Sequence, residues 1–146
     1  MQTLFIGADH NGFELKNQLI DHLQEQNIRI EDMGNMVNDP EDDYTVFAKS
    51  VAQAVLQNPE LHKGIVICGS GIGVAMMANR FKGIRCGLCQ SAQAAQHGRA
   101  NDDINVLSLA SSYTTFDEAC RIVEAFINTP FSPLDKYVRR SRQLDE

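Results

Sequence analysis

One stretch, Cys68-Gly69-Ser70-Gly71-Ile72-Gly73, brings together a thiol, a hydroxyl and three alternating glycines. A β-branched apolar run, residues 65–67, precedes it, and the Ala- and Met-rich residues 74–80 follow it, so the pattern predicts strand, loop and helix. Such a loop forms an anion site, because its backbone N–H groups face inward and the helix dipole favours negative charge. Many glycine loops only allow a tight turn, but a thiol at the end of the strand favours a chemical site.

This loop does not match the common glycine motifs. No Gly-Lys-Ser/Thr follows it, so it is not a P-loop, and the Gly-x-Gly-x-Gly spacing after the third strand-like run is a poor dinucleotide fingerprint. Ser70 lies in Gly-Ser-Gly rather than Gly-x-Ser-x-Gly, so a serine hydrolase is poorly supported.

A second pair of chemical side chains, Asp9 and His10, follows the first strand-like run. In a parallel sheet the carboxyl ends of the strands share one edge, so Asp9, His10 and Cys68 are expected to converge. The alternative is a turn and helix-capping role for the aspartate, since Asp is a favoured cap. His22 and His62 are expected at solvated positions, and His97, near the end of a short helix, is a weaker candidate.

No set of His, Cys and carboxylate residues has the spacing of a metal site, so no metal is expected. Cys86 and Cys89 form a Cys-x-x-Cys, but they lie in a strand-like run, where positions three apart point to opposite faces. We expect them to be packing thiols, and the four cysteines do not suggest a disulfide framework.

Strand-like runs and helical runs alternate five times along the chain. Strands are expected at residues 3–6, 28–30, 65–67, 83–89 and 105–109, and helices from residue 13 onward and at 44–56, 74–80, 91–99, 115–127 and 134–144. In the helix at 44–56, Val46, Val51, Ala52 and Val55 are the expected core. The alternation predicts a three-layer α/β/α, Rossmann-like fold with a five-stranded parallel sheet.

One domain, residues 1–146, is the simplest division of the chain. The C-terminal tail, residues 131–146, contains a helix with no strand of its own and is expected to dock on a neighbouring subunit. The net charge of −6 argues against non-specific nucleic-acid binding. No apolar stretch is long enough to span a bilayer and no leader is recognisable, so a cytoplasmic protein is expected.

Several short motifs resemble, in order, those of the type B ribose-5-phosphate isomerase family, which includes galactose- and allose-6-phosphate isomerases. They are Gly7-Ala8-Asp9-His10, Asp43-Tyr44, Cys68-Gly69-Ser70-Gly71-Ile72-Gly73, Ala78-Asn79-Arg80, Gly83-Ile84-Arg85 and Asn105-Val106-Leu107. The resemblance covers nearly the whole chain. It implies a homodimer that pairs into a tetramer in some members, active sites across the dimer interface, and no metal or organic cofactor.

The resemblance also implies an aldose–ketose isomerase of a sugar phosphate, with ribose 5-phosphate and ribulose 5-phosphate as the favoured pair. The alternatives are a hexose 6-phosphate isomerase and a weakly active or non-catalytic subunit. Cys68 would be the base, as a thiolate favoured by the helix N-terminus, and Ser70 would assist proton movement at the oxygens. Asp9 would help to open the sugar ring.

The remaining roles that the resemblance implies concern substrate binding. His10 and Tyr44 would line the site, and the amides of Gly69, Gly71, Ile72 and Gly73 would stabilise the enediolate oxygens. Asn79, Asn101 and Arg139 complete the expected set of substrate-binding residues.

The chain departs from the family pattern at two places. The family's ring-opening histidine is replaced by Asn101, and His97, about one helical turn upstream, is a candidate substitute. In the tail, the family's Gly-Gly-Arg-His is replaced by Pro133-Leu134-Asp135-Lys136, and only Arg139 matches a phosphate-binding arginine.

Two readings from other classes stay open. A binding module could keep the fold and the anion loop, although it would need no thiol there. A nucleotide-binding α/β domain would use an acidic residue at the end of the second strand for a ribose, and Glu31 and Asp32 could serve.

Overall fold

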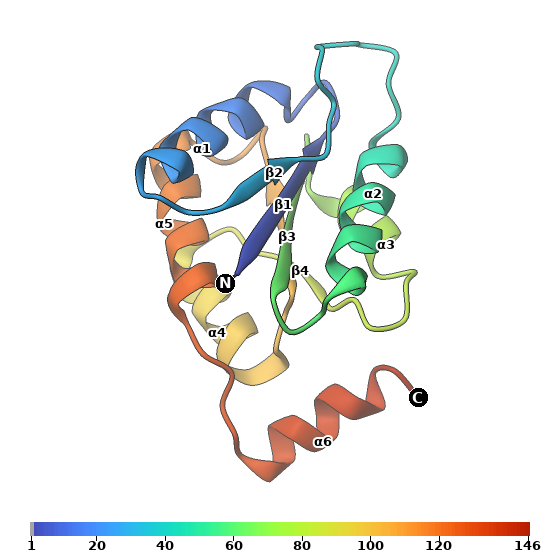
Figure 1. Ribbon diagram of the computed structural model, residues 1–146, viewed down its shortest axis with the longest axis vertical. Helices are drawn as coiled ribbons and strands as arrows, with labels where there is room; N and C mark the ends of the chain where they lie inside the picture. The colour runs from blue at the N-terminus through green and yellow to red at the C-terminus, as the bar shows by residue number, and fades with distance from the viewer. Residues whose placement is uncertain (1) are drawn as a thin grey trace.

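The computed structural model describes residues 2–146, and its centre is a five-stranded, entirely parallel sheet (Figure 1). The strands are β1 (Thr3–Ala8), β2 (Ile30–Asp32), β3 (His62–Cys68), β4 (Cys86–Leu88) and β5 (Val106–Ala110). Their order across the sheet is β2-β1-β3-β5-β4. The predicted parallel sheet is therefore confirmed.

Helices cover both faces of the sheet, as Figure 1 shows. They are α1 (Phe13–Glu25), α2 (Tyr44–Gln57), α3 (Ile72–Ala78), α4 (Ala92–Asp102), α5 (Phe116–Asn128) and α6 (Asp135–Gln143). The helices α1, α4 and α5 pack on one face, and α2 and α3 pack on the other. This is the predicted three-layer α/β/α arrangement.

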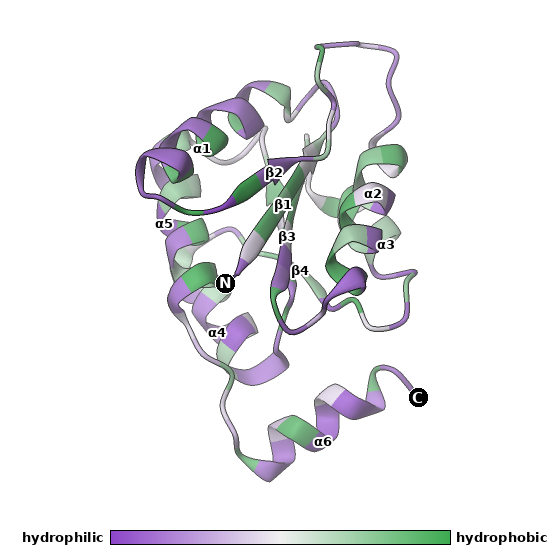
Figure 2. Cartoon of the chain, viewed as in Figure 1, coloured by the Kyte–Doolittle hydropathy of each residue, from purple (hydrophilic) through white to green (hydrophobic). Residues whose placement is uncertain are grey.

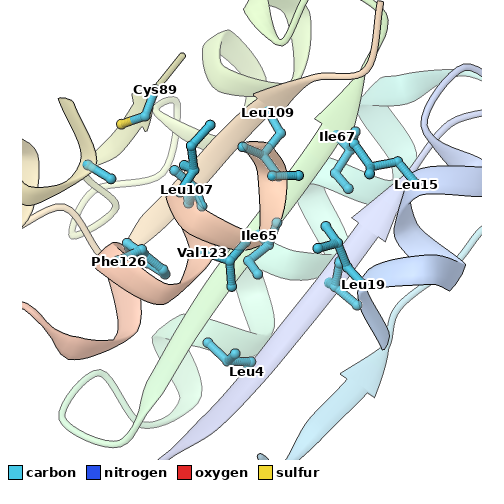
Figure 3. Close-up of a cluster of buried hydrophobic side chains, with 14 of the residues drawn as sticks. Leu4, Leu15, Leu19, Ile65, Ile67, Cys89, Leu107, Leu109, Val123 and Phe126 are labelled. Atoms are coloured by element: carbon cyan, nitrogen blue, oxygen red, sulfur yellow. The ribbon is translucent and has the colours of Figure 1, made fainter. Parts of the chain in front are cut away.

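Each face of the sheet has its own apolar core. Figure 3 shows the larger one, in which Ile65, Ile67 and Leu107 of the central strands meet Leu19 of α1 and Phe126 of α5. On the other face Val51, Ala52 and Val55 of α2 are fully buried, as predicted. Val46 is 55 % exposed, so its predicted place in the core is wrong. Within residues 2–146 no helix is long and apolar enough to cross a membrane.

The second and fourth strands differ in their bounds from the predicted runs. The amide of Ile28 donates to the carbonyl of Leu23 at the end of α1, so this residue completes a turn and β2 begins only at Ile30. The chain before β4 also turns, with Gly83 at φ +93° and the amide of Ile84 bound to the carbonyl of Phe81. Backbone groups engaged in turns cannot join the ladder.

The tail crosses below the sheet as α6 and contacts its own chain at both ends (Figure 1). The amide of Ser132 donates to the carbonyl of Ala100, and the Asp145 carboxylate accepts from the amide of Gly83 at 2.9 Å. No residue of α6 is buried, and Figure 2 shows hydrophilic residues along most of it, with an apolar patch.

Candidate active site

The site lies where β1 and β3 end side by side. Ala8 and Ile67 are partners in the β1–β3 ladder, and the next amide, that of Asp9, donates to the carbonyl of Ile67 at 3.4 Å. Asp9 is thus the first residue after β1 and Cys68 is the last residue of β3, on adjacent strands that lie about 4.8 Å apart. The chain leaves β1 for β2 on one side and β3 lies on the other, which makes this the topological switch point of the sheet.

Cys68 is 5 % exposed, and its backbone is held by the loop after β5. The amide of Ser111 donates to the carbonyl of Cys68 at 2.9 Å, and that of Ser112 donates to the carbonyl of Gly69 at 3.0 Å. The Ser111 hydroxyl also donates to the carbonyl of Asn11 at 2.8 Å. This loop is therefore a third wall of the site, in addition to the ends of β1 and β3.

The Ser70 hydroxyl lies at the start of α3 and accepts a hydrogen bond from the amide of Ile72 at 3.1 Å. Its own proton stays available to donate to a ligand oxygen. The amide of Ile72 is engaged in this bond, so it is a poorer anion donor than expected. Within residues 2–146 the amides of Gly69, Ser70 and Gly71 have no hydrogen-bond partner, so they remain as donors.

Two positions of the loop require glycine. Gly71 has φ +71°, and a Cβ there would lie 2.6 Å from Leu88 Cδ1. At Gly73 the Tyr44 ring leaves no room, because a Cβ would lie 2.6 Å from Tyr44 Cε1. Tyr44 is the first residue of α2, and its ring therefore packs directly on the first turn of α3. The structure thus brings Tyr44 to the glycine loop, as the resemblance implied.

Asp9 is 4 % exposed, and one of its oxygens closes the turn into α1. Asp9 Oδ1 accepts from the amides of Asn11 at 3.0 Å and Gly12 at 3.2 Å. The turn role is therefore correct for this oxygen, whereas the helix-capping role is wrong, because α1 begins after Gly12 without a side-chain cap. Within residues 2–146 the other oxygen, Oδ2, has no hydrogen-bond partner, so the turn role and the ring-opening role are compatible.

His10 forms an ion pair with Asp42, a residue that the sequence analysis missed. His10 Nδ1 lies 2.7 Å from Asp42 Oδ1, and the amide of His10 donates to the same oxygen at 3.1 Å. This hydrogen bond is the largest cause of a raised pKa of His10, and the nearby Asp9 and Asp39 carboxylates add to it. Burial alone would raise the pKa of Asp42, but hydrogen bonds from His10 and Asn35 outweigh it, so that pKa is lowered.

Asp9, His10 and Asp42 are also the one group among the described residues whose ligand atoms lie close enough to hold a metal ion, all within 4.8 Å of one another. In this group His10 and Asp42 are hydrogen-bonded to each other, and the Asp9 carboxylate beside them closes a turn of the backbone. Both Asp42 oxygens and Asp9 Oδ1 already accept hydrogen bonds from protein groups.

Cys86, Cys89 and His62 behave as packing residues. Cys86 packs on the α2–α3 side of the sheet and Cys89 on the α1–α5 side, which confirms the prediction of opposite faces. Burial raises the pKa of Cys86, and it raises the pKa of Cys89 to about 11, so both stay protonated at neutral pH. His62 begins β3, stacks edge-on against Phe5 and bonds the carbonyl of Ala54, so its predicted solvated position is wrong.

The sequence profile of the ribose/galactose isomerase family matches residues 4–144. The chain belongs to the ribose/galactose isomerase family. A relative from Mycoplasma pneumoniae, named probable ribose-5-phosphate isomerase B, is 41 % identical over 128 residues, which are 88 % of this chain and 84 % of the relative.

Solved structures of this family share the fold over nearly the whole chain. Ribose-5-phosphate isomerase B from Mycoplasma genitalium, solved with bound ribulose 5-phosphate, has a TM-score of 0.94 at 37 % identity and covers 97 % of this chain and 93 % of its own. The Thermotoga maritima enzyme has a TM-score of 0.93 at 35 % identity and covers 99 % and 97 %.

The structure does not bring Asn79 to the site. Asn79 lies at the far end of α3, about 10 Å from its first residue. Its side chain donates to the carbonyl of Cys86 at 2.9 Å and accepts from the amide of Cys86 at 2.8 Å. Both polar groups thus fix the edge strand β4, which is a structural role.

Asn101 and Arg139 lie at the opposite end of the sheet from Cys68. Asn101 is in the last turn of α4, from which the chain enters β5, whereas Cys68 pairs with Ala110 at the exit of β5. The strand separates these ends by roughly 15 Å. Arg139 is on α6, beyond the same end of the sheet. In a single chain of this isomerase family member, the predicted site residues therefore lie in two groups, one around Cys68 and the other around Asn101 and Arg139.

Proposed function

We propose that this protein interconverts ribose 5-phosphate and ribulose 5-phosphate through an enediolate, with Cys68 as the base. The observation that carries the proposal is the meeting of Asp9, Cys68 and Ser70 at the switch point of the sheet, in a chain of the ribose/galactose isomerase family. The ligand reported in the Mycoplasma genitalium relative, ribulose 5-phosphate, supports this choice of substrate.

The reaction moves one proton between two carbons. The Cys68 thiolate removes the proton from C2 of the open-chain aldose. The electrons of the C2–H bond form the C1=C2 double bond, and the π electrons of the C1 carbonyl move onto its oxygen. The thiol then returns the proton to C1, so that the carbonyl forms at C2. Each transfer needs a base held close to the reacting carbons, which the end of a buried strand provides.

The oxygens of the enediolate need donors and a proton shuttle. The free amides of Gly69, Ser70 and Gly71 are suited to the charge that develops on them. The Ser70 hydroxyl, with its oxygen already bound to the amide of Ile72, can donate its proton to O1 and take one from O2. Asp9 Oδ2 is the acceptor for the anomeric hydroxyl when the ring opens.

We further propose that the active unit is a dimer in which a second copy supplies Asn101 and Arg139. The separation of these residues from Cys68 within one chain supports this, because no single copy can place both groups on one small sugar. Each chain would then act as one domain, residues 1–146. The tail would stay attached to its own chain through Asp145 while Arg139 reaches the neighbour.

A coupled assay of ribulose 5-phosphate formation tests the reaction, with the hexose phosphates of galactose and allose as competing substrates. The highest kcat/KM on ribose 5-phosphate supports the proposal. Preference for a hexose phosphate by tenfold or more would replace the substrate but not the reaction, and no isomerisation of any aldose phosphate would refute it.

Active-site complementation tests the shared site. Chains with Cys68→Ala and chains with Arg139→Ala are each expected to be nearly inactive. When they are mixed and allowed to exchange, mixed dimers contain one site with both native residues, so part of the activity should return. A monomer in sedimentation at micromolar concentration, or no recovery in a mixture shown to exchange, would contradict the dimer.

The compartment and the absence of a metal remain predictions. All four cysteines are free, which fits the reducing cytoplasm that we expect for a sugar-phosphate enzyme. Fractionation of the source cells checks the compartment.

A further inference from the structure

His10 is bound twice to a single oxygen of Asp42. The ring Nδ1 lies 2.7 Å from Asp42 Oδ1, and the backbone amide of His10 donates to that oxygen at 3.1 Å. These bonds join the end of β1 to the loop before α2, 32 residues further along the chain. With Nδ1 occupied, Nε2 is the remaining ring donor, and within residues 2–146 it has no hydrogen-bond partner. The ring is 30 % exposed, so a ligand can reach it.

Asp42 is itself held in place from the neighbouring strand end. Its side chain is only 5 % exposed, and Asp42 Oδ2 accepts from Asn35 Nδ2 at 3.1 Å. The amide of Asn35 donates to the carbonyl of Ala8 at 2.8 Å, and the amide of Ala8 donates to the carbonyl of Gly34 at 2.7 Å. The carboxylate therefore has a fixed position relative to β1, although it lies in a long surface loop.

The charges that face His10 have one sign. The groups that act on it are the carboxylates of Asp42, Asp9 and Asp39, and all three raise its pKa. Lys16, a cation of the neighbouring helix α1, is fully buried and forms an ion pair with Asp32 at 2.7 Å. A sugar phosphate that approaches Cys68 can therefore meet the partly exposed ring of His10, which is positively charged when protonated.

We propose that Asp42 is a positioning residue of the isomerase, which holds His10 charged and oriented so that its Nε2–H contacts the anionic oxygens of the substrate. This inference rests on the proposed sugar-phosphate function. It adds Asp42 to the residues that serve the active site, and it gives the loop 35–43 a role in holding His10. Asp42 does not itself touch the substrate. It supplies the negative charge that keeps the ring protonated, and the two hydrogen bonds fix the direction of the ring.

Titration of His10 by NMR measures the charge directly and needs no activity. The His10 signal is assigned by its loss in His10→Asn, which keeps a donor close to the Nδ1 position. In Asp42→Asn the pKa of His10 should fall toward the ordinary 6.5, because an amide oxygen still accepts the bond but carries no charge. Glu41→Gln, an exposed change of equal charge in the same loop, is the control and should leave the His10 titration almost unshifted.

The kinetic test uses a double-mutant cycle. We expect Asp42→Asn to raise KM about tenfold at pH 7.5 with kcat less affected, the scale of one charge-assisted contact. In the His10→Asn background the same substitution should add nothing further, because its effect passes through the ring. An equal loss in both backgrounds would mean that Asp42 only anchors the loop, and would overturn the proposal.

The pH dependence of Tm is a third test, because the pair of His10 and Asp42 is expected to stabilise the fold more at low pH than at high pH. Because the folded state raises the pKa of His10, the pair stabilises the fold below about pH 6.5, and this contribution is lost as the pH rises through the raised pKa. Asp42→Asn should therefore lower Tm more at about pH 6 than at about pH 9. An equal change in Tm at both values would contradict a charged pair.

Binding of inorganic phosphate separates failure of this inference from failure of the proposed function. If wild-type protein binds phosphate with a shift of the His10 signal, and Asp42→Asn weakens this binding while Glu41→Gln does not, the inference holds even if ribose 5-phosphate is not the substrate. An unchanged His10 pKa in Asp42→Asn overturns it whatever the activity. Broadening or loss of the His10 titration on addition of Mg²⁺ or Zn²⁺, reversed by EDTA, would identify a cation site and also overturn it.

Discussion

The amide of Asp9 donates to the carbonyl of Ile67, the residue immediately before Cys68. This one backbone bond extends the β1–β3 ladder by a step and brings a buried carboxylate and a buried thiol to adjacent strand ends. Both side chains are at most 5 % exposed, so the reacting end of the site is shielded from bulk water. A shielded site strengthens the electrostatic contacts on which an enediolate depends.

Replacement of the thiol should separate chemistry from binding. Cys68→Ala is expected to lower kcat at least about a hundredfold, the scale for a positioned base, with KM little changed. Cys120→Ala, on the α1–α5 side of the sheet, is the matched control and should keep normal kinetics. Near-normal turnover of Cys68→Ala on ribose 5-phosphate would rule this residue out as the base.

The contact between Gly73 and Tyr44 predicts a specific steric effect. In Gly73→Ala the added Cβ meets the Tyr44 ring at 2.6 Å, so the ring must move away from the glycine loop. We expect kcat/KM to fall about tenfold, equivalent to ~1.4 kcal/mol of transition-state stabilisation. In a Tyr44→Ala background the same glycine substitution should cost little, and a full tenfold loss there would show that the ring is not the cause.

The buried pair of Lys16 and Asp32 should respond unequally to loss of its two members. Lys16 is fully buried, whereas Asp32 is 25 % exposed and also accepts from the amide of Gly34. Asp32→Ala leaves a buried lysine without its carboxylate and should cost roughly 3 kcal/mol in the free energy of unfolding. Lys16→Met should cost less, because the remaining carboxylate can still be hydrated.

Urea denaturation measures both changes. Asp21→Ala, an exposed carboxylate on α1, serves as the control and should stay within about 0.5 kcal/mol of wild type. A larger loss in Lys16→Met than in Asp32→Ala would contradict this order. The pair also bears on the nucleotide-binding alternative, because both oxygens of Asp32 are engaged within the chain and are not free for a ribose.

The last prediction concerns ring opening. Asn101 Nδ2 lies 3.2 Å from His97 Nδ1, one turn earlier on the same face of α4, so the two side chains are in contact. An amide cannot transfer a proton at neutral pH, whereas the imidazole can. If His97 is the donor, His97→Ala should slow isomerisation of ribose 5-phosphate selectively. It should hardly affect erythrose 4-phosphate, whose phosphorylated O4 cannot close a furanose ring.

Asn101→His tests the alternative, in which the chain relies on substrate that is already open. In that case the variant should raise activity on ribose 5-phosphate while leaving the open-chain substrate unchanged. The ratio of the two rates is the measured quantity, and a substitution at the exposed Gln96 of the same helix, Gln96→Ala, controls for indirect effects. If neither variant changes the ratio, this end of α4 takes no part in ring opening.

The local order of residues was enough to predict the sheet and one half of the site. Alternating apolar runs specify parallel strands, and parallel strands bring their carboxyl ends to one edge, so Asp9, His10 and Cys68 were expected there from their order along the chain. Their roles, and that of Ser70, were implied by the family resemblance. The strand bounds at β2 and β4 were wrong because the amide of Ile28 donates to the carbonyl of Leu23 in a turn and the amide of Gly83 donates to the Asp145 carboxylate, and residue type does not reveal these partners.

Contacts between distant segments were decided only by the tertiary structure. Asp42 resembled any acidic residue of an exposed loop, and its burial depends on Asn35 and His10 closing over it from two strand ends. Asn79 matched a motif, yet the fold uses its amide to fix β4. The sequence determines which side chains can do chemistry, because this depends on their type and their order along the strands. The hydrogen-bond partners of these side chains, and the end of the sheet at which each side chain lies, follow from packing between segments that are far apart along the chain.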